Sequence, residues 1–199
     1  MKTFFSEKHK LRDANTELYG GELVKPFERP QRLDFIVDEI KTRGLGEILN
    51  PNKVNLNIIG KVHDQDYIKF LDNAWNEWTK EGFKGEAIPT VWPSRSMNSE
   101  KIPTFIEGKL GYYSLAGETS ISNGSIEAAY EAVRVAISAV DTLVNDKLSG
   151  IFALCRPPGH HASKNQYGGY CFFNNAAIAA ERFKAVSYTH LTLPTTGVV

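Results

Sequence analysis

A short apolar run at residues 151–154 stands between two segments of helical pattern, and this arrangement restricts the fold more than any other feature. Residues 125–145 before it are rich in alanine and repeat their apolar side chains at helical spacing. A loop over 156–173 follows, and a second helix is expected from Asn174 or Asn175. Such a short apolar run is typical of a strand buried on both faces. Strands separated by helices predict an α/β fold with a parallel sheet.

Further strands and a helix are expected nearer the N-terminus. Residues 2–6 form a short strand, and the alternation of apolar and polar residues over 54–59 predicts a second one. A helix starts at Glu28-Arg29-Pro30, because an early proline costs a helix little, and Gly44 ends it.

A third helix is expected after Asp64, a residue suited to the N-cap position. Its apolar stripe faces the core and consists of Tyr67, Ile68, Leu71, Trp75 and Trp78. The connector over 79–103 holds two glycines and three prolines, and its length is unusual for a connector inside a compact domain. We therefore expect it to be a functional or interface loop.

Composition excludes several classes of protein. The 199 residues carry 23 Lys and Arg against 23 Asp and Glu, so no basic surplus favours nucleic acid or a membrane surface. The N-terminal residues are not those of a signal peptide, and no run approaches a membrane span. Only two cysteines are present, which favours a reducing compartment and predicts a cytoplasmic protein.

Two adjacent histidines, His160 and His161, follow the apolar run at 151–154. The carboxyl end of a strand is where open α/β sheets place ligand crevices. The intervening Pro157-Pro158-Gly159 makes a rigid turn, so a defined backbone presents both imidazoles. Histidine is suited to proton transfer near neutral pH, although such a pair is more often exposed or hydrogen-bonded without a catalytic role.

A glycine-aromatic loop over 168–173 lies just beyond, where glycines allow close backbone approach and aromatic rings line a narrow slot. A zinc site from Cys155, His160, His161 and Cys171 is conceivable by ligand type. Neither cysteine has the short spacing of structural zinc sites, so Cys155 is more simply a small buried hydrophobe. Nucleophile-elbow, phosphate-loop and dinucleotide motifs are absent.

Both motifs resemble the zinc-dependent histone deacetylase superfamily, and within it the bacterial acetylpolyamine amidohydrolases. The likeness covers about residues 1–184. It rests on Arg156-Pro157-Pro158-Gly159-His160-His161-Ala162 and on Gly168-Gly169-Tyr170-Cys171-Phe172-Phe173-Asn174-Asn175. The resemblance implies an arginase-like fold, a mostly parallel sheet with helices on both faces, of which these residues supply about three strands. It also implies hydrolysis of an acetyl amide with zinc as cofactor.

The resemblance also implies roles for individual residues. His161 is similar to the family's general base and acid, and His160 to its electrostatic partner. Gly169 would offer its carbonyl to the substrate amide, and Tyr170 would form one wall of the channel.

Three glutamates, Glu17, Glu107 and Glu118, match positions that polyamine enzymes hold near the channel mouth. Carboxylates there would favour a slender cationic substrate, whereas the alternative for each is a solvated surface glutamate. The loop over 79–103 resembles the insertion through which such enzymes dimerise. Deacetylation of acetyl-lysine in proteins is the second candidate activity, and a ureohydrolase is less favoured because its metal motifs are absent.

Zinc ligands of the family are missing from the sequence. The Asp-x-His pair, a later Asp and a late tyrosine have no counterpart, and no Asp or Glu follows Glu181. Residues 185–199 carry no Lys, Arg, Asp or Glu, and we expect this tail not to be native. The sequence thus predicts residues 1–184 to be the N-terminal part of a deacetylase domain, inactive alone and with an unpaired strand edge. A non-catalytic dimerising fragment is the alternative.

Overall fold

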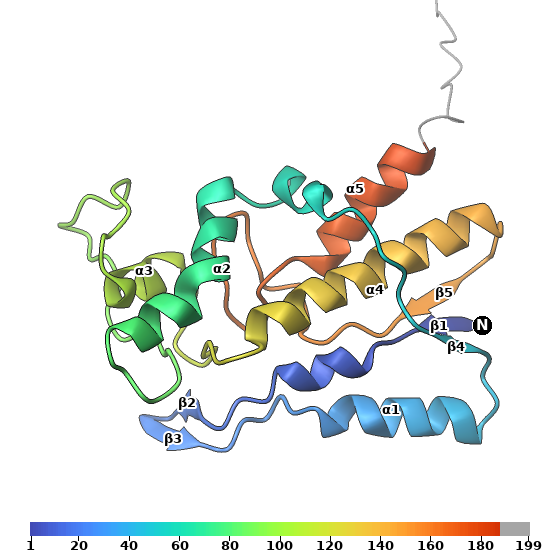
Figure 1. Cartoon of the computed structure of the whole chain (residues 1–199), viewed down its shortest axis with the longest axis horizontal. Helices are drawn as coiled ribbons and strands as arrows, with labels where there is room; N and C mark the ends of the chain where they lie inside the picture. Colours follow the sequence, from blue (N-terminus) through green and yellow to red (C-terminus); the bar gives the residue numbers. More distant parts are fainter. Residues whose placement is uncertain (188–199) are drawn as a thin grey trace, which may run out of the picture.

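Three short parallel strands form the sheet that positions the site, in the order β4-β1-β5. The computed structural model describes residues 1–187 (Figure 1). The elements in chain order are β1 (Lys2–Phe4), η1 (Glu7–Leu11), β2 (Glu17–Tyr19), β3 (Glu22–Val24), α1 (Gln31–Thr42), β4 (Ile48–Leu49), η2 (Asn57–Lys61), α2 (Gln65–Lys80), α3 (Ile106–Tyr113), α4 (Ser125–Asn145), β5 (Ile151–Ala153) and α5 (Asn175–Ser187).

Helices cover both faces of the sheet, as the α/β prediction requires. Alternate side chains of a strand point to opposite faces. Phe5 and Leu154 therefore pack with Leu33 and Val37 of α1, whereas Phe4 packs with α4 on the other face. In Figure 1 the sheet lies between these two helices at the end of the molecule that holds the N-terminus.

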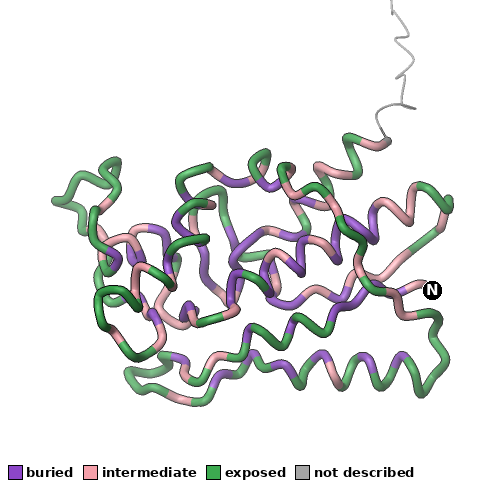
Figure 2. The backbone as a smooth tube through the Cα atoms, viewed as in Figure 1, coloured by how far each residue is buried: buried purple, intermediate pink, exposed green. Residues whose placement is uncertain are grey.

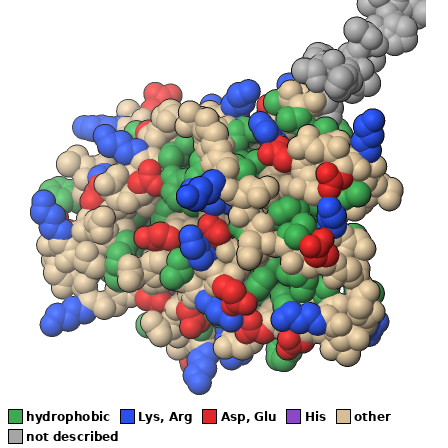
Figure 3. Space-filling model, turned by 45° about the vertical axis from the view of Figure 1, so that its right-hand side comes forward, with side chains coloured by type: hydrophobic (Ala, Val, Ile, Leu, Met, Phe, Trp, Pro, Cys, Tyr) green, Lys and Arg blue, Asp and Glu red, His purple; other side chains and the backbone are tan. Residues whose placement is uncertain are grey.

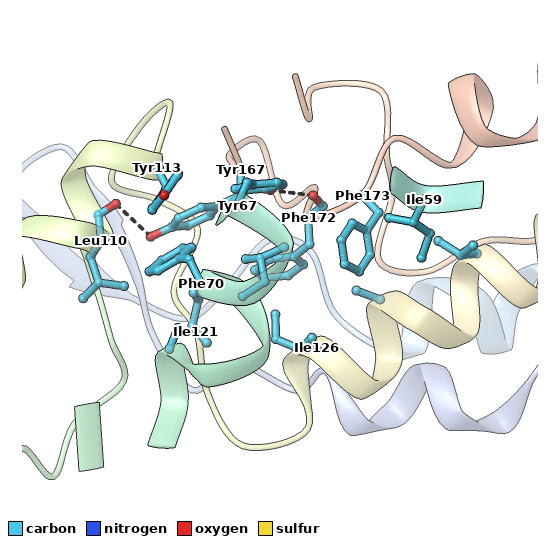
Figure 4. Close-up of a cluster of buried hydrophobic side chains, with 14 of the residues drawn as sticks. Ile59, Tyr67, Phe70, Leu110, Tyr113, Ile121, Ile126, Tyr167, Phe172 and Phe173 are labelled. Carbon is cyan, nitrogen blue, oxygen red and sulfur yellow. Dashed lines mark hydrogen bonds between the residues drawn. The ribbon is translucent and has the colours of Figure 1, made fainter. Parts of the chain in front are cut away.

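The main hydrophobic core lies between the helices, beside the small sheet (Figure 4). The aromatic stripe of α2 faces this core as predicted: Tyr67 and Leu71 are buried, and the three other members are partly buried against it. The Tyr67 hydroxyl donates to the Phe172 carbonyl oxygen at 2.6 Å. The core therefore holds the glycine-aromatic loop directly against α2.

Most predicted elements are confirmed. The helix over 125–145 is α4, the run at 151–154 supplies β5, and the strand at 2–6 supplies β1. Burial alternates along the amphipathic helices (Figure 2). Asp64 occupies the N-cap of α2, but its side chain makes no capping bond and pairs with Lys164 at 3.0 Å.

The predicted strand at 54–59 is wrong. Residues 57–61 form η2, and the strand beside β1 is β4 at Ile48–Leu49. The apolar side chains of 54–59 pack on the main core, while Arg134 of α4 donates to the Val54 carbonyl oxygen at 3.3 Å. The backbone at Val54 thus bonds to a side chain of α4 and not to a neighbouring strand.

The predicted non-native tail falls mostly outside the described residues, since α5 continues to Ser187 and 188–199 are not described. Within residues 1–187, no helix has the length and apolar character to cross a membrane.

His9 generates a prediction on the pH dependence of stability. Burial, and second the nearby Arg156, lower the pKa of this imidazole to about 4, and neither ring nitrogen has a hydrogen-bond partner. Between the ordinary pKa of 6.5 and 4, the unfolded chain binds a proton that the native chain does not. The free energy of unfolding therefore falls as the pH drops through this window, by up to about 3 kcal/mol from this group.

The His9→Leu variant should lose this contribution, which urea unfolding at pH 7 and pH 4.5 measures relative to the parent chain. Phe5→Leu is the matched control. The ring centroids of Phe5 and His9 are 5.3 Å apart, and phenylalanine has no titratable group. The Phe5→Leu variant should lower stability equally at both pH values. An unchanged pH slope in His9→Leu would contradict the assignment.

Candidate active site

The two histidines lie in the loop that leaves the carboxyl end of β5. The Leu154 N–H donates to the Phe4 carbonyl oxygen at 2.9 Å and prolongs the ladder to the start of this loop. Both His160 and His161 are exposed, and their ring centroids are 4.3 Å apart. The sheet thus places two neighbouring imidazoles at its carboxyl edge, open to solvent in the described part of the chain.

Buried contacts fix both ends of the histidine loop. The Arg156 guanidinium, 2% exposed, donates from Nε to Glu28 at 2.8 Å and from Nη1 to the His9 carbonyl oxygen at 2.6 Å. Asn175 Nδ2 donates to the Pro157 carbonyl oxygen at 3.1 Å. A Cβ on Gly159 would collide with the backbone of Asn175, so only glycine fits where the loop meets the start of α5.

Gly169 lies directly against the His161 ring, and a Cβ on this glycine would collide with the imidazole. Its φ of +56° is also a conformation that favours glycine. The Cys171 thiol joins the two segments: it accepts from the His161 N–H at 3.5 Å and donates to the Gly169 carbonyl oxygen at 3.2 Å. The two sequence motifs therefore form one site.

Two carboxylates accept hydrogen bonds from the glycine-aromatic loop. Glu118 Oε1 accepts from the Gly169 N–H at 2.5 Å, and Glu17 Oε1 accepts from the Tyr170 hydroxyl at 2.7 Å. The second Glu17 oxygen accepts from the Phe27 N–H at 3.0 Å. Burial, and then the bond to Glu17, raise the pKa of Tyr170, so this phenol stays protonated.

The three glutamates expected near the channel mouth thus differ in environment. Glu17 is 3% exposed with both oxygens bonded, so the alternative of a solvated surface residue is wrong for it. Glu118 is half-buried beside Gly169. Glu107 is exposed on the first turn of α3, and no bond in the described structure joins it to the site loops. Placement of these residues at a channel mouth stays a prediction.

His63 and Glu28 are structural members of the site that the sequence did not reveal. His63 Nε2 accepts from the Asn174 N–H at 2.9 Å, next to the start of α5, and burial lowers the pKa of this ring. His63 therefore supports the far end of the site loops rather than the helix that follows it. Glu28 pairs with a residue 128 positions away, and no local pattern indicates such a pair.

Residues 1–187 contain no group of three or more His, Cys, Asp or Glu side chains that could hold a metal ion. The alternative ligand set of both cysteines and both histidines is not formed, because Cys171 is bonded within the loop. Cys155 donates to the Ala132 carbonyl oxygen at 3.4 Å, and burial raises the pKa of its thiol to about 12. The residues present therefore do not fit a zinc centre by themselves.

Comparison with known proteins gives consistent matches. Residues 26–191 match the histone deacetylase domain family. An acetylpolyamine amidohydrolase of Mycoplana ramosa is 50% identical over 182 residues, which are 92% of this chain and 53% of that protein. Acetylpolyamine amidohydrolase 2 of Pseudomonas aeruginosa is 42% identical over 183 residues, which are also 92% of this chain and 53% of that protein. The chain spans about half the length of the curated relatives it matches.

A solved structure shares the fold. The crystal structure of an acetylpolyamine aminohydrolase from Burkholderia pseudomallei, from an iodide soak, superposes with a TM-score of 0.83 at 30% sequence identity. The superposition covers 93% of this chain and 53% of that one. The architecture of strands and helices described above is therefore that of about half of a longer chain of known fold.

The contact between Gly169 and His161 generates a second prediction. Gly169→Ala should lower the free energy of unfolding by about 1–3 kcal/mol, because the new methyl group meets the imidazole in a strained backbone conformation. Urea unfolding measures the loss, and the NMR signals of the His161 ring should shift. Gly85→Ala is the matched control, because a Cβ there meets open space, and its effect should stay within about 0.5 kcal/mol. Equal effects of both substitutions would contradict the predicted contact.

Proposed function

The chain belongs to the histone deacetylase domain family, and on this basis we propose that it forms the proton-transfer and substrate-binding part of an acetyl-amide hydrolase. The observation that carries the proposal is the packing of His161 against Gly169, whose loop is held by hydrogen bonds to the carboxylates of Glu118 and Glu17. A proton-transfer group and a substrate-binding carbonyl thereby share one fixed backbone unit.

In hydrolysis of an acetyl amide, the histidines, the Gly169 carbonyl and Tyr170 would each have a distinct role. His161 accepts a proton from the attacking water, whose oxygen forms the new bond to the acetyl carbon, and returns it to the departing amine nitrogen. The C–N bond breaks and acetate and a free amine leave. His160, whose ring lies 4.3 Å away, orients the water and stabilises charge. The Gly169 carbonyl oxygen keeps a second lone pair beside the Cys171 thiol for the substrate N–H, and Tyr170 forms a wall.

An acetylated polyamine is the substrate class we favour. Relatives at 50% and 42% identity carry the name acetylpolyamine amidohydrolase. The carboxylates of Glu17 and Glu118 lie next to Tyr170 and Gly169 and add negative charge where a cationic chain would pass. Acetyl-lysine in proteins is the competing substrate, and its bulkier polypeptide would be less suited to this environment.

Residues 1–187 do not by themselves complete a zinc centre. The family resemblance implies zinc, but residues 1–187 provide no ligand group for it, so we propose that ligands outside these residues complete the centre. The chain alone is then an inactive part of a cytoplasmic enzyme. The exposed Val91, Trp92 and Met97 in the connector after α2 support the further proposal that this loop forms a contact between copies.

The third prediction concerns the chain alone. Purified in the presence of zinc and dialysed, it should retain well below one zinc per chain by elemental analysis. It should also show no hydrolysis of acetylputrescine or of an acetyl-lysine peptide above the buffer rate. Stoichiometric zinc together with turnover would contradict the proposal that the centre is incomplete.

The fourth prediction concerns substrate choice. In a chimera that joins residues 1–184 to the unmatched remainder of the Mycoplana ramosa relative, Glu118→Gln should lower kcat/KM for acetylputrescine about tenfold, or about 1.4 kcal/mol. It should lower kcat/KM for an acetyl-lysine peptide less than threefold, roughly 0.6 kcal/mol. Glu17→Gln should act in the same direction, with an added loss on both substrates because Glu17 holds Tyr170.

Glu127→Gln is the control for this series, because Glu127 is exposed on α4 and no described hydrogen bond or ion pair joins it to the two site loops. Its kinetics should match those of the parent chimera. Equal losses on both substrates in Glu118→Gln would count against a role in recognising the polyamine cation.

A further inference from the structure

The sequence contains one Asn-Gly pair, Asn123-Gly124, in the turn that leads into α4. An asparagine side chain followed by glycine can react with its own backbone, because glycine has no Cβ to hinder approach to its nitrogen. The turn is anchored on both sides, since Ile121 and Ile126 are buried and point into the main core (Figure 4). Asn123 itself is exposed. The Asn-Gly pair therefore lies at the outer tip of a fixed turn.

The two groups that would react are free to meet. Within residues 1–187, neither the Asn123 side-chain amide nor the Gly124 N–H has a hydrogen-bond partner. Asn123 lines two surface cavities, of about 190 and 480 Å³, so its side chain has room to rotate. Gly124 has a φ of +81°, and a Cβ there would collide with the Leu11 carbonyl oxygen. The fold thus requires glycine after this asparagine and leaves the pair unprotected.

The start of α4 favours the charge that such a reaction develops. Attack by the Gly124 nitrogen requires loss of its proton and places negative charge on the Asn123 side-chain oxygen. Gly124 is the N-cap residue of α4, which is 21 residues long. The first N–H groups of a helix lack intrahelical partners, and its N-terminus carries a partial positive charge. This charge stabilises an anion at Asn123.

The same turn supports the glycine-aromatic loop through Arg12. This guanidinium, 3% exposed, donates from Nη1 to the hydroxyls of Ser125 at 3.2 Å and Ser122 at 3.5 Å. The Ser122 N–H donates to the same Ser125 hydroxyl at 3.0 Å. Arg12 Cζ lies 5.6 Å from the centroid of the Phe172 ring. A change of backbone length between Ser122 and Ser125 therefore reaches the loop at Phe172.

We propose that Asn123-Gly124 is a site of spontaneous modification, where the chain converts its own asparagine to aspartate and isoaspartate. The Gly124 nitrogen gives its proton to solvent and bonds to the side-chain carbonyl carbon of Asn123. The bond from that carbon to the side-chain nitrogen breaks, and the nitrogen takes up a proton and leaves as ammonia. A cyclic imide remains. This inference does not depend on the proposed function.

Water then opens the imide at one of its two carbonyls. Attack at the side-chain carbonyl gives aspartate. Attack at the main-chain carbonyl gives isoaspartate, in which the main chain continues through the former side-chain carbon. Overall, one water enters and one ammonia leaves, and no oxidant or reductant is needed.

The two products differ in their effect on the turn. Aspartate adds one negative charge beside the N-terminus of α4, where the helix dipole favours it. Isoaspartate adds the same charge and one further main-chain carbon between Ser122 and Ser125, whose hydroxyls share Arg12. The isoaspartate form should therefore unfold at a lower urea concentration than the parent chain, whereas Asn123→Asp should not.

Incubation of the full chain at pH 6 and pH 8.5 tests the proposal, with peptide mapping by mass spectrometry in water labelled with heavy oxygen. Asn123 should lose its amide at least tenfold faster than Asn98, which is also exposed but is followed by serine and accepts from the Glu100 N–H at 2.9 Å. The product should carry one solvent oxygen. The reaction should be faster at pH 8.5, because the Gly124 nitrogen must lose its proton.

Charge separates the modified chains from the parent. The sequence carries equal numbers of basic and acidic side chains, and Figure 3 shows both signs intermixed on the visible face. Each conversion therefore gives a formally neutral chain one negative charge, and ion-exchange chromatography isolates the product for urea unfolding. Fragment ions then distinguish isoaspartate from aspartate.

Asn123→Gln is the matched control, because it keeps the amide but its longer side chain must close a larger and less favoured ring. It should abolish both the modification and the loss of stability on incubation at pH 8.5. Asn123→Asp separates the effect of the charge from that of the longer backbone. Circular dichroism establishes that both variants are folded like the parent.

Three outcomes would overturn the proposal. The first is loss of the amide at Asn98 as fast as at Asn123. The second is a reaction at Asn123 more than tenfold slower in the native chain than in urea, which would show that the turn protects it. The third is an isoaspartate form that unfolds at the same urea concentration as Asn123→Asp, which would contradict the effect through Arg12.

Discussion

A buried guanidinium links the N-terminal part of the chain to the histidine loop. Arg156 donates to Glu28 through Nε and to the His9 carbonyl oxygen through Nη1. Glu28 lies 128 residues before Arg156 in the sequence and His9 lies 147 residues before it, so the contact joins distant segments. Removing one partner of such a buried pair costs about 3–5 kcal/mol, because the other charge is left uncompensated. The position of the Pro-Pro-Gly turn, and with it both histidines, depends on this contact.

Two carboxylates, those of Glu17 and Glu118, support the glycine-aromatic loop. Glu118 binds the Gly169 N–H and Glu17 binds the Tyr170 hydroxyl, so both fix the loop that would contact a substrate. Their negative charge remains in place for a cationic ligand. Glu17 and Glu118 are therefore structural supports of this loop, and the proposed recognition of a cation would use the same two carboxylates.

Local pattern predicted the elements whose partners lie on regular helix or strand faces. The alanine-rich helix α4 and the aromatic stripe of α2 follow from side-chain period, and the strand before the histidines follows from its apolar run. The strand predicted from the alternation at 54–59 is wrong. The apolar side chains there pack on the main core, and the Arg134 side chain of α4 donates to the Val54 carbonyl oxygen. Alternation indicates which side chains are buried, but it does not identify what the backbone binds.

The sequence by itself determined the family motifs, the helix-strand pattern and the absence of the usual zinc ligands, because each is a property of residue type and spacing. Only the tertiary structure decided that His161 packs on Gly169, that Glu17 is buried, and that His63 and Glu28 support the site. It also placed β5 at the edge of the sheet. These facts depend on contacts between residues far apart in the chain, which form only when the whole core packs and which no local pattern encodes.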